Sequence, residues 1–195
     1  MIRLARSLGY SCILAAAALA LAADELEVRV ERKRDVFLVQ AAVPVAVDPA
    51  TAWQVLTDYN RLAEFVPDMR VSRVVSAPGE PILLEQHGES GFLFFRTEIR
   101  VVLRIEEDPL RRIVFRSVGG NIERMQGEWR VVRDADAIRL SYRAEIEPEF
   151  WVPPLLGDAI LKGHVEKQIS GVVKEMLRRY AEARGTIVPS GRSTP

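Results

Sequence analysis

Hydrophobic and polar residues alternate along much of the middle of the chain, which is the pattern of β-strands with one buried face. The segment 92–107 shows this alternation over the greatest length. Its odd-numbered positions are almost all apolar, whereas arginines and glutamates dominate the even-numbered ones. The segment 138–147 repeats the pattern. We therefore expect each strand to have one dry face, and a register slip of one residue would move the whole apolar set into water.

Turn-forming residues divide the region from Met69 to Glu147 into antiparallel strands. We place two of the turns at Glu89-Ser90-Gly91 and at Gly119-Gly120-Asn121. Two shorter extended runs, Leu26–Val30 and Val36–Val47, come first and predict a hairpin. The other predicted strands cover 69–76, 82–88, 92–107, 111–118, 122–133 and 138–147.

Helical spacing predicts three helices. Asp48 and Pro49 suit the N-cap and first position of a short helix, and a second short helix covers 61–65. The last helix runs from about Pro154 to Ala183 and has an apolar stripe along one side. A twisted sheet with one dry face needs a cover, and this helix is the element large enough to supply it. Such a sheet seldom fills its interior, so we expect a pocket between sheet and helix.

The N-terminus has the layout of a secretory signal peptide. Arg3 and Arg6 precede an apolar run that ends in the small-x-small sequence Ala20-Leu21-Ala22. We expect cleavage after residue 22, which would send the protein to the periplasm and remove its single cysteine, Cys12. Cleavage would also remove two of the 27 basic residues and none of the 27 acidic ones, leaving a formal charge of about −2. Retention of the segment as a membrane anchor is the alternative.

About 170 residues then remain, which suits one domain over 24–184 followed by a small polar tail over 185–195 that we expect to be disordered. No basic stripe is interleaved with aromatic residues, so nucleic acid is excluded as an expected partner. We expect a monomer.

Parts of the sequence resemble the polyketide cyclase/coenzyme Q-binding branch of the START-like (SRPBCC) superfamily. The resemblance covers about residues 36–180, and it depends most on the block that opens with Leu56-Thr57-Asp58-Tyr59 and continues through Glu64-Phe65-Val66-Pro67. Gly127-Glu128-Trp129 and Ile146-Glu147-Pro148 also match at the level of pattern. The resemblance implies an α+β helix-grip fold (START-like or Bet v 1-like). In this fold a curved antiparallel sheet wraps around a long C-terminal helix, and two short helices follow the first long strand. It also implies a lipophilic pocket, but it does not imply a reaction.

The inward faces of the predicted strands and of the last helix supply the candidate ligand-binding residues. Trp129 and Tyr142 carry a polar group on an apolar body, so they could either bond within the protein or hold the polar head of a ligand. The full candidate set is Phe95, Thr97, Ile99, Val101, Met125, Trp129, Tyr142, Ile160 and Val173.

Four more residues are candidates for an apolar rim at the mouth of the pocket. Phe92 and Phe94 fall on the nominally wet face beside a predicted turn, and Trp151 and Leu155 belong to an unusually apolar connection before the last helix. These side chains could pack locally. They could instead touch a membrane transiently while ligand is exchanged.

Candidate catalytic and metal-binding residues are scarce. His87 and His164 lie on separate predicted elements, which does not make a metal site, and Gly-x-Ser-x-Gly is absent. We therefore expect no catalytic set, no metal and no cofactor. A periplasmic carrier for a lipid, an isoprenoid quinone or a similar apolar molecule is our first hypothesis. A cyclase or dehydratase acting on an aromatic or polyketide substrate is the second, and an assembly module that docks through the apolar rim is the third.

Overall fold

A computed structural model describes residues 25–92, 95–149, 152 and 157–185. The predicted signal peptide therefore lies outside the described residues, as do residues 186–195 of the predicted tail. No helix in the described part of the chain is long and apolar enough to cross a membrane.

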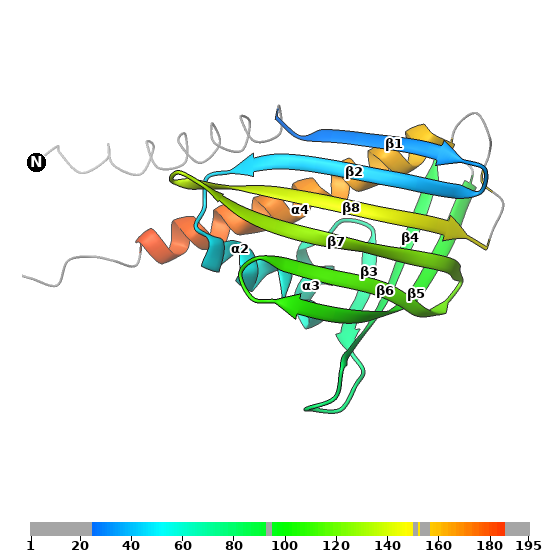
Figure 1. Ribbon diagram of the computed structural model, residues 1–195, viewed down its shortest axis with the longest axis horizontal. Coiled ribbons are helices and arrows are strands. Elements are labelled where there is room, and N and C mark those ends of the chain that lie inside the picture. The colour runs from blue at the N-terminus through cyan, green and yellow to red at the C-terminus, as the bar shows by residue number, and fades with distance from the viewer. Residues whose placement is uncertain (1–24, 93–94, 150–151, 153–156, 186–195) are drawn as a thin grey trace, which may run out of the picture.

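Eight antiparallel strands form a single sheet in the order β1-β2-β8-β7-β6-β5-β4-β3 (Figure 1). Each strand from β3 to β7 pairs with the next along the chain, and β8, the last strand, also pairs with β2. The strands are β1 (Glu27–Lys33), β2 (Val36–Val45), β3 (Met69–Val74), β4 (Ile82–Phe92), β5 (Phe95–Asp108), β6 (Arg112–Gly120), β7 (Ile122–Asp134) and β8 (Ala137–Pro148).

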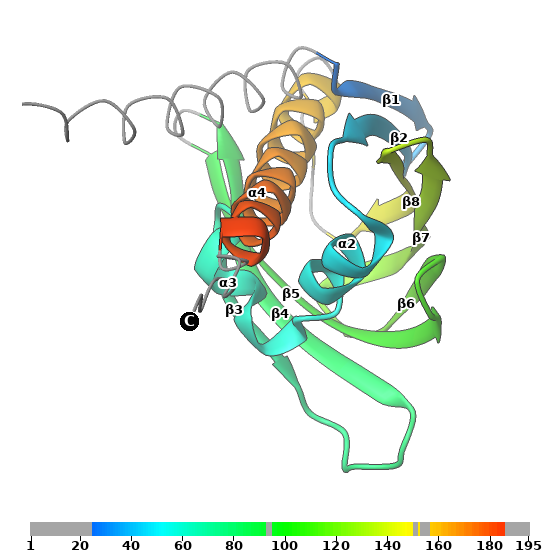
Figure 2. The same ribbon diagram turned by 90° about the vertical axis from the view of Figure 1, so that its left-hand side faces the viewer.

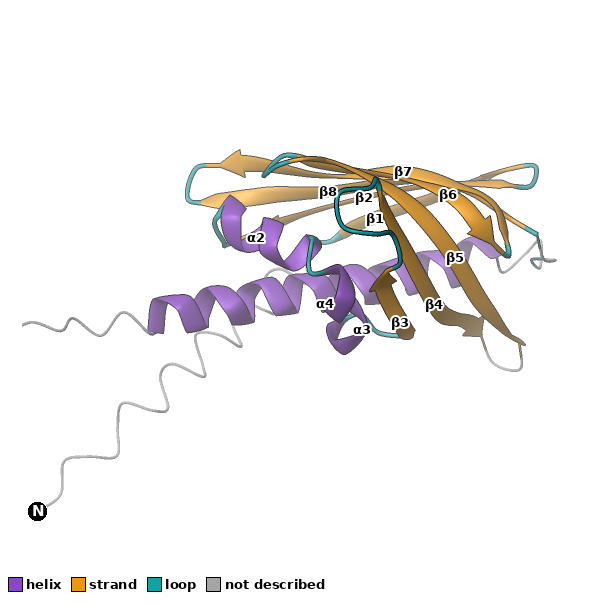
Figure 3. Cartoon of the chain, turned by 90° about the horizontal axis from the view of Figure 1, so that it is seen from below, coloured by secondary structure: helices purple, strands orange, loops and turns teal. Residues whose placement is uncertain are grey.

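The sheet curls around the long helix α4 (Gly157–Gly185), as the end-on view shows (Figure 2). The helix α2 (Pro49–Leu56), the 3-10 turn η1 (Tyr59–Arg61) and the one-turn helix α3 (Leu62–Phe65) connect β2 to β3. The helices all lie on the same, concave side of the sheet (Figure 3). This arrangement confirms the predicted helix-grip fold.

Polar side chains set the ends of the short helices. The Asp48 carboxylate caps α2 by accepting hydrogen bonds from the backbone N–H groups of Ala50 (2.8 Å) and Thr51 (2.9 Å). The connection to β3 is fixed too, because the Val74 N–H donates to Asn60 Oδ1 (2.8 Å) and the Ser72 hydroxyl donates to the Tyr59 carbonyl (2.6 Å). The edge strand β3 is thereby tied to the segment that covers it.

The predicted two-residue alternation is confirmed where it matters for the core. Val101, Leu103 and Ile105 of β5 are buried, whereas Arg104 and Glu106 between and beside them are exposed. Strand β8 behaves in the same way. From the other side, α4 contributes Val165, Ile169, Val172, Val173 and Met176 to the same core.

Two predicted turns belong instead to strands. Strand β4 continues through Glu89-Ser90-Gly91 to Phe92, because these residues pair with β5 up to its first residue, Phe95. Strand β6 similarly extends to Gly120. The β5–β6 register shifts by one residue just after Val102, so the two glycines lie in an irregular strand end rather than in the turn itself.

Candidate ligand-binding cavity

A cavity of about 130 Å³ lies between the concave face of the sheet and the helical layer, and it is partly open to solvent. The sheet supplies its largest wall. That wall comprises Leu84 and Gln86 of β4, Leu103 and Ile105 of β5, Ile113 and Phe115 of β6, Met125 and Trp129 of β7, and Tyr142 of β8.

The opposite wall comes from α4 and from the segment that leads into β3. On α4 the lining residues are Val165, Gln168, Ile169 and Val172, whose spacing of three and four places them on one side of the helix. The remaining lining residues are Leu56, Tyr59, Leu62, Val66 and Met69. None of the described residues that line the cavity carries a charge at neutral pH.

Three aromatic side chains form one end of the sheet wall. Tyr142 pairs with Trp129 across β7 and β8, and their ring centroids are 4.6 Å apart at 48°. The Phe115 ring also stacks on Tyr142, at 5.8 Å and 14°. These two contacts hold the Tyr142 ring in place, and they leave its hydroxyl as the group that remains to be satisfied.

The Tyr142 hydroxyl has no hydrogen-bond partner among the described residues, although the residue as a whole is only 9% exposed. Burial raises the pKa of this phenol well above its ordinary value, so the group stays neutral and can donate a proton to a hydrogen bond at any physiological pH. No fully buried side-chain nitrogen or oxygen lacks a partner among the described residues, so this hydroxyl is open to the cavity rather than sealed in the core, and a ligand can reach it.

A glycine makes room for this aromatic group. Gly127 of β7 pairs with Phe115 of β6, and a Cβ atom built on Gly127 would lie 2.6 Å from Cζ of the Phe115 ring. The tip of the ring therefore occupies space that a side chain at this position would need, and the Arg143 carbonyl oxygen of β8 would lie even closer, at 2.1 Å.

Tyr59 supplies a second phenol, but that phenol is already engaged. Its hydroxyl donates to Oε1 of Glu107 at 2.5 Å. Burial raises the Tyr59 pKa, and the neighbouring Glu107 carboxylate raises it further. Because Glu107 is exposed, this bond lies where the cavity wall meets solvent. The cavity thus has one satisfied and one unsatisfied tyrosine hydroxyl.

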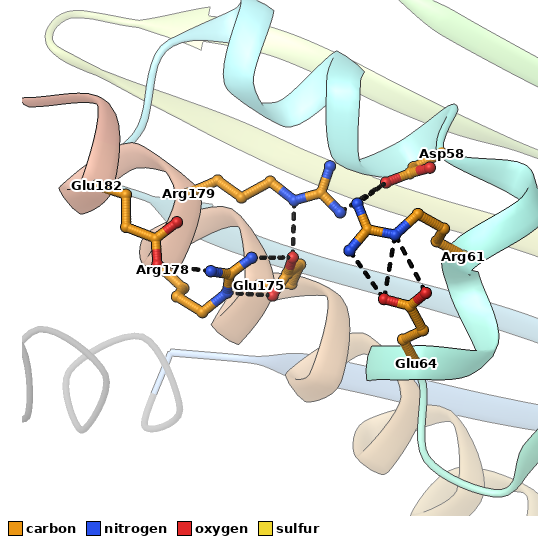
Figure 4. A network of polar contacts seen from close by, with 7 residues as sticks. All are labelled: Asp58, Arg61, Glu64, Glu175, Arg178, Arg179 and Glu182. Atoms are coloured by element: carbon orange, nitrogen blue, oxygen red, sulfur yellow. Dashed lines mark hydrogen bonds and ion pairs between the residues drawn. The ribbon is translucent and has the colours of Figure 1, made fainter. Parts of the chain in front are cut away.

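Beyond the cavity, ion pairs connect the C-terminal half of α4 to the segment before α3 (Figure 4). Glu175 accepts hydrogen bonds from Arg178 and from Arg179, each at 2.7 Å, and Arg179 also donates to Asp58 at 2.7 Å. These arginines lower the pKa of Glu175 to about 2, despite burial of the carboxylate. Arg61 and Glu64 continue the network along α3.

The two histidines lie apart from the cavity. His87 Nε2 lies 2.9 Å from Glu85 Oε1 on β4, and Glu85 also accepts a hydrogen bond from Arg73. His164 of α4 lies 4.0 Å from Asp68, and burial lowers the His164 pKa. No group of three or more potential metal ligands occurs within the described residues.

The structure brings part of the predicted site together. Met125, Trp129 and Tyr142 line the cavity. Val101 and Val173 are buried in the core but are not lining residues, and Ile99 and Ile160 are half-buried away from the lining set. Phe95 and Thr97 belong to β5, and Phe92 ends β4, but their side chains lie outside the described part, as do Phe94, Trp151 and Leu155 entirely.

Other lining residues were not predicted. Phe115 and Ile113 follow the same alternation as the predicted strands, and Val165, Ile169 and Val172 have helical spacing, so both sets had a readable signal. Gln86 and Gln168 could not be recognised from the sequence, because the sequence does not distinguish a half-buried glutamine from one on the surface.

The sequence model of the family described as "Polyketide cyclase / dehydrase and lipid transport" matches residues 45–172. Comparison with curated proteins gave no match.

Solved structures with the same fold include the Zhui aromatase/cyclase of Streptomyces sp. R1128. It shares 20% sequence identity, with a TM-score of 0.61 over 80% of this chain and 99% of that one. A START superfamily protein of Mycobacterium smegmatis shares 14% identity at a TM-score of 0.58, covering 75% and 98%. The STAR-related lipid transfer protein of Xanthomonas axonopodis shares 15% identity at a TM-score of 0.56, covering 80% and 99%. These identities establish the shared fold alone.

Proposed function

The chain belongs to the polyketide cyclase/dehydrase and lipid transport family, and from that premise we propose that it binds and carries a hydrophobic ligand in the periplasm. The ligand would occupy the space between the concave face of the sheet and α4. The observation that carries this proposal is the cavity itself, whose described lining is apolar apart from two tyrosines, a tryptophan and two glutamines. Such a lining gains free energy by taking apolar surface out of water.

Catalysis by cyclisation or dehydration has less support in this cavity. Proton transfer near pH 7 favours a group with a pKa close to 7. The described lining contains no histidine, lysine or carboxylate, and burial raises the pKa of both of its tyrosines. An aromatase/cyclase shares the fold, but its distant sequence carries no residue roles to this chain. A docking module would not need an internal space, so the cavity favours ligand binding over the third hypothesis as well.

The periplasmic location is part of the proposal, and the N-terminal sequence supports it. Cell fractionation with N-terminal sequencing of the purified protein tests it directly. We expect the mature chain to begin at Ala23 in the periplasmic fraction. A chain that retains residues 1–22, or one found in the cytoplasm, would contradict this part.

Ligand binding is tested by native mass spectrometry of the protein purified from its own periplasm, followed by solvent extraction and analysis of the extract. We expect a non-covalent adduct that is lost on extraction and recovered in the organic phase. A protein that carries no adduct and takes up no apolar dye would contradict the proposal.

Two neighbouring valines of α4 provide a matched pair for this test. Val172 lines the cavity, whereas Val173 is equally buried but is not among the lining residues. Val172→Phe places extra volume in the cavity, so we expect it to abolish dye and ligand uptake. Val173→Phe should lower the free energy of unfolding by about 1–3 kcal/mol through overpacking but leave uptake intact. Equal uptake by the two variants would count against the cavity as the binding site.

Membrane contact at the predicted rim remains a further proposal. Exchange of an apolar ligand with a bilayer is faster if apolar side chains touch the membrane. The double substitution of Phe92 and Phe94 by Ser should reduce liposome binding without a large change in Tm. Unchanged liposome affinity would contradict the contact.

A further inference from the structure

We propose that the cavity selects an uncharged, ring-sized ligand with an oxygen that accepts a hydrogen bond from the Tyr142 hydroxyl, an inference that rests on the proposed function. The carbonyl of an aryl ketone has this chemistry. A fatty acid or a phospholipid would not be taken up whole. Three features of the described residues carry the inference: the volume of the cavity, the absence of charge on its lining, and the unsatisfied phenol.

The volume limits what can enter. The cavity measures about 130 Å³, close to the engineered cavities of about 150 Å³ that bind a single benzene ring. Pockets that enclose drug-sized molecules measure about 300–1,000 Å³. A single ring with a small substituent therefore fits, and any long chain attached to it would have to extend through the open side.

The lining excludes a charged head group. A carboxylate or an ammonium group would lose its hydration in the cavity and meet no opposite charge among the described lining residues, which is a large penalty. The carboxylate of Glu107 does not change this, because it lies on the exposed side and is bonded to Tyr59. The ligand must therefore be neutral where it touches this wall.

Tyr142 defines the polar part of the ligand. Its ring contacts both Phe115 and Trp129, and its hydroxyl is without a partner among the described residues. Because the phenol is neutral, it can donate to an acceptor of the ligand. A ligand without an acceptor would displace solvent from this hydroxyl and give it no partner in return, so the site discriminates between two apolar molecules of the same shape.

The aromatic wall favours a planar ligand. Trp129, Phe115 and Tyr142 all line the cavity, and aromatic rings pair well with another ring in offset or edge-to-face geometry. A planar group that conjugates its oxygen with a ring keeps that oxygen in the ring plane. Aryl ketones have this geometry.

The test compares acetophenone with ethylbenzene, which have nearly the same shape and differ in the carbonyl oxygen. Both are titrated into the protein stripped of any native ligand, and binding is followed by two-dimensional NMR. We expect acetophenone to bind about 5- to 10-fold more tightly than ethylbenzene, as one neutral hydrogen bond would produce. Benzoate should show no saturable binding in the cavity at pH 7.

Tyr142→Phe removes the donor and keeps the ring. We expect the preference for acetophenone to disappear in this variant, mainly through weaker acetophenone binding. Tyr180→Phe is the matched control, because the Tyr180 hydroxyl accepts a hydrogen bond from Arg184 at the end of α4 and Tyr180 is not a lining residue. It should keep the full preference.

The outcomes separate this inference from the proposed function. Equal affinities for acetophenone and ethylbenzene in the unmodified protein would overturn the inference but leave hydrophobic binding standing. A preference that survives Tyr142→Phe would overturn the role of the phenol. Tight uptake of palmitate together with no binding of either ring compound would overturn the ligand class. If neither ring compounds, palmitate nor an apolar dye binds, the proposed function fails as well.

Discussion

The two halves of α4 have different roles: the first half lines the cavity, and the second half anchors the helix. The half before Val173 places Val165, Ile169 and Val172 against a space that side chains leave unfilled. The half after it has Met176 with no exposed surface and Glu175 held by two arginines. The helix is thus closely packed around Met176 and Glu175, near the start of its C-terminal half, and loosely packed against the sheet just before them.

This difference separates stability from binding within one element. Free energy gained where Met176 packs into the core and where Arg179 bridges Glu175 to Asp58 holds α4 in place even though the contacts around the cavity are incomplete. A ligand can then use those missing contacts, because filling a void restores the dispersion contacts that the lining lacks. The predictions below test this division of roles.

The largest expected effect comes from Met176, which is fully buried in the second half of α4. Met176→Ala should lower the free energy of unfolding by about 2–5 kcal/mol, since it opens a cavity in a filled region. Denaturant unfolding measures this change. Val165→Ala, in the half that faces the existing space, should cost clearly less. The reverse order would contradict the contrast between the two halves.

The next effect comes from the charge on Glu175. Its pKa is lowered to about 2 in the folded protein, so its ionised form stabilises the fold above the ordinary carboxyl pKa near 4.5. That stabilisation is lost as the pH falls from about 4.5 toward 2. Glu175→Gln should therefore cost about 2–3 kcal/mol at pH 7, and the difference from the unmodified protein should shrink toward pH 2. Urea unfolding over this pH range provides the measurement.

Glu182→Gln is the control for Glu175→Gln. Glu182 also bonds to Arg178, but its side chain is 63% exposed. Its substitution should change the stability by no more than about 0.5 kcal/mol at any pH. A loss as large as that of Glu175→Gln would show that burial of Glu175 is not what matters.

A smaller effect is expected at Arg179. Its guanidinium donates to Glu175 and Asp58 together and lies 5.6 Å from the centroid of the Phe65 ring. Lysine cannot span both carboxylates in this geometry, so Arg179→Lys should cost about 1 kcal/mol, with a loss that becomes smaller at high salt. Thermal unfolding at low and high salt tests this. No difference between the two residues would show that the bridge to Asp58 adds nothing.

The smallest effect on stability is expected at Tyr142, in the half of the molecule built for binding. Removing a hydroxyl that has no partner among the described residues should change the free energy of unfolding by less than about 0.5 kcal/mol. Urea unfolding of Tyr142→Phe without ligand is the measurement. A loss above about 1 kcal/mol would mean that the hydroxyl is satisfied within the protein.

Most of the fold could be predicted from the sequence, because strand faces and helix starts depend on local patterns. The alternation around Leu103 and Ile105, and the Asp48 cap, are examples. Two turns were misplaced because glycines near Gly91 and Gly120 are tolerated inside strands and at bulges.

The cavity was harder to predict. The alternation of apolar and polar residues identifies buried side chains, but it does not show which of them face an unfilled space. Val172 and Val173 are both apolar and both buried, yet Val172 lines the cavity and Val173 does not. The curl of the sheet and the position of α4 decide between them. The Arg179–Asp58 bridge spans 121 residues of sequence, so charge pattern alone could not reveal it.

The lack of a side chain at Gly127 affects the neighbouring strands as well as β7. Any side chain at this position would first meet the backbone of β8, 2.1 Å from the Arg143 carbonyl oxygen, and then Cζ of the Phe115 ring at 2.6 Å. A single added methyl group would therefore disturb both the pairing of β7 with β8 and a ring that lines the cavity. Glycine at this position thus couples the spacing of two strands to the shape of the compartment between sheet and helix.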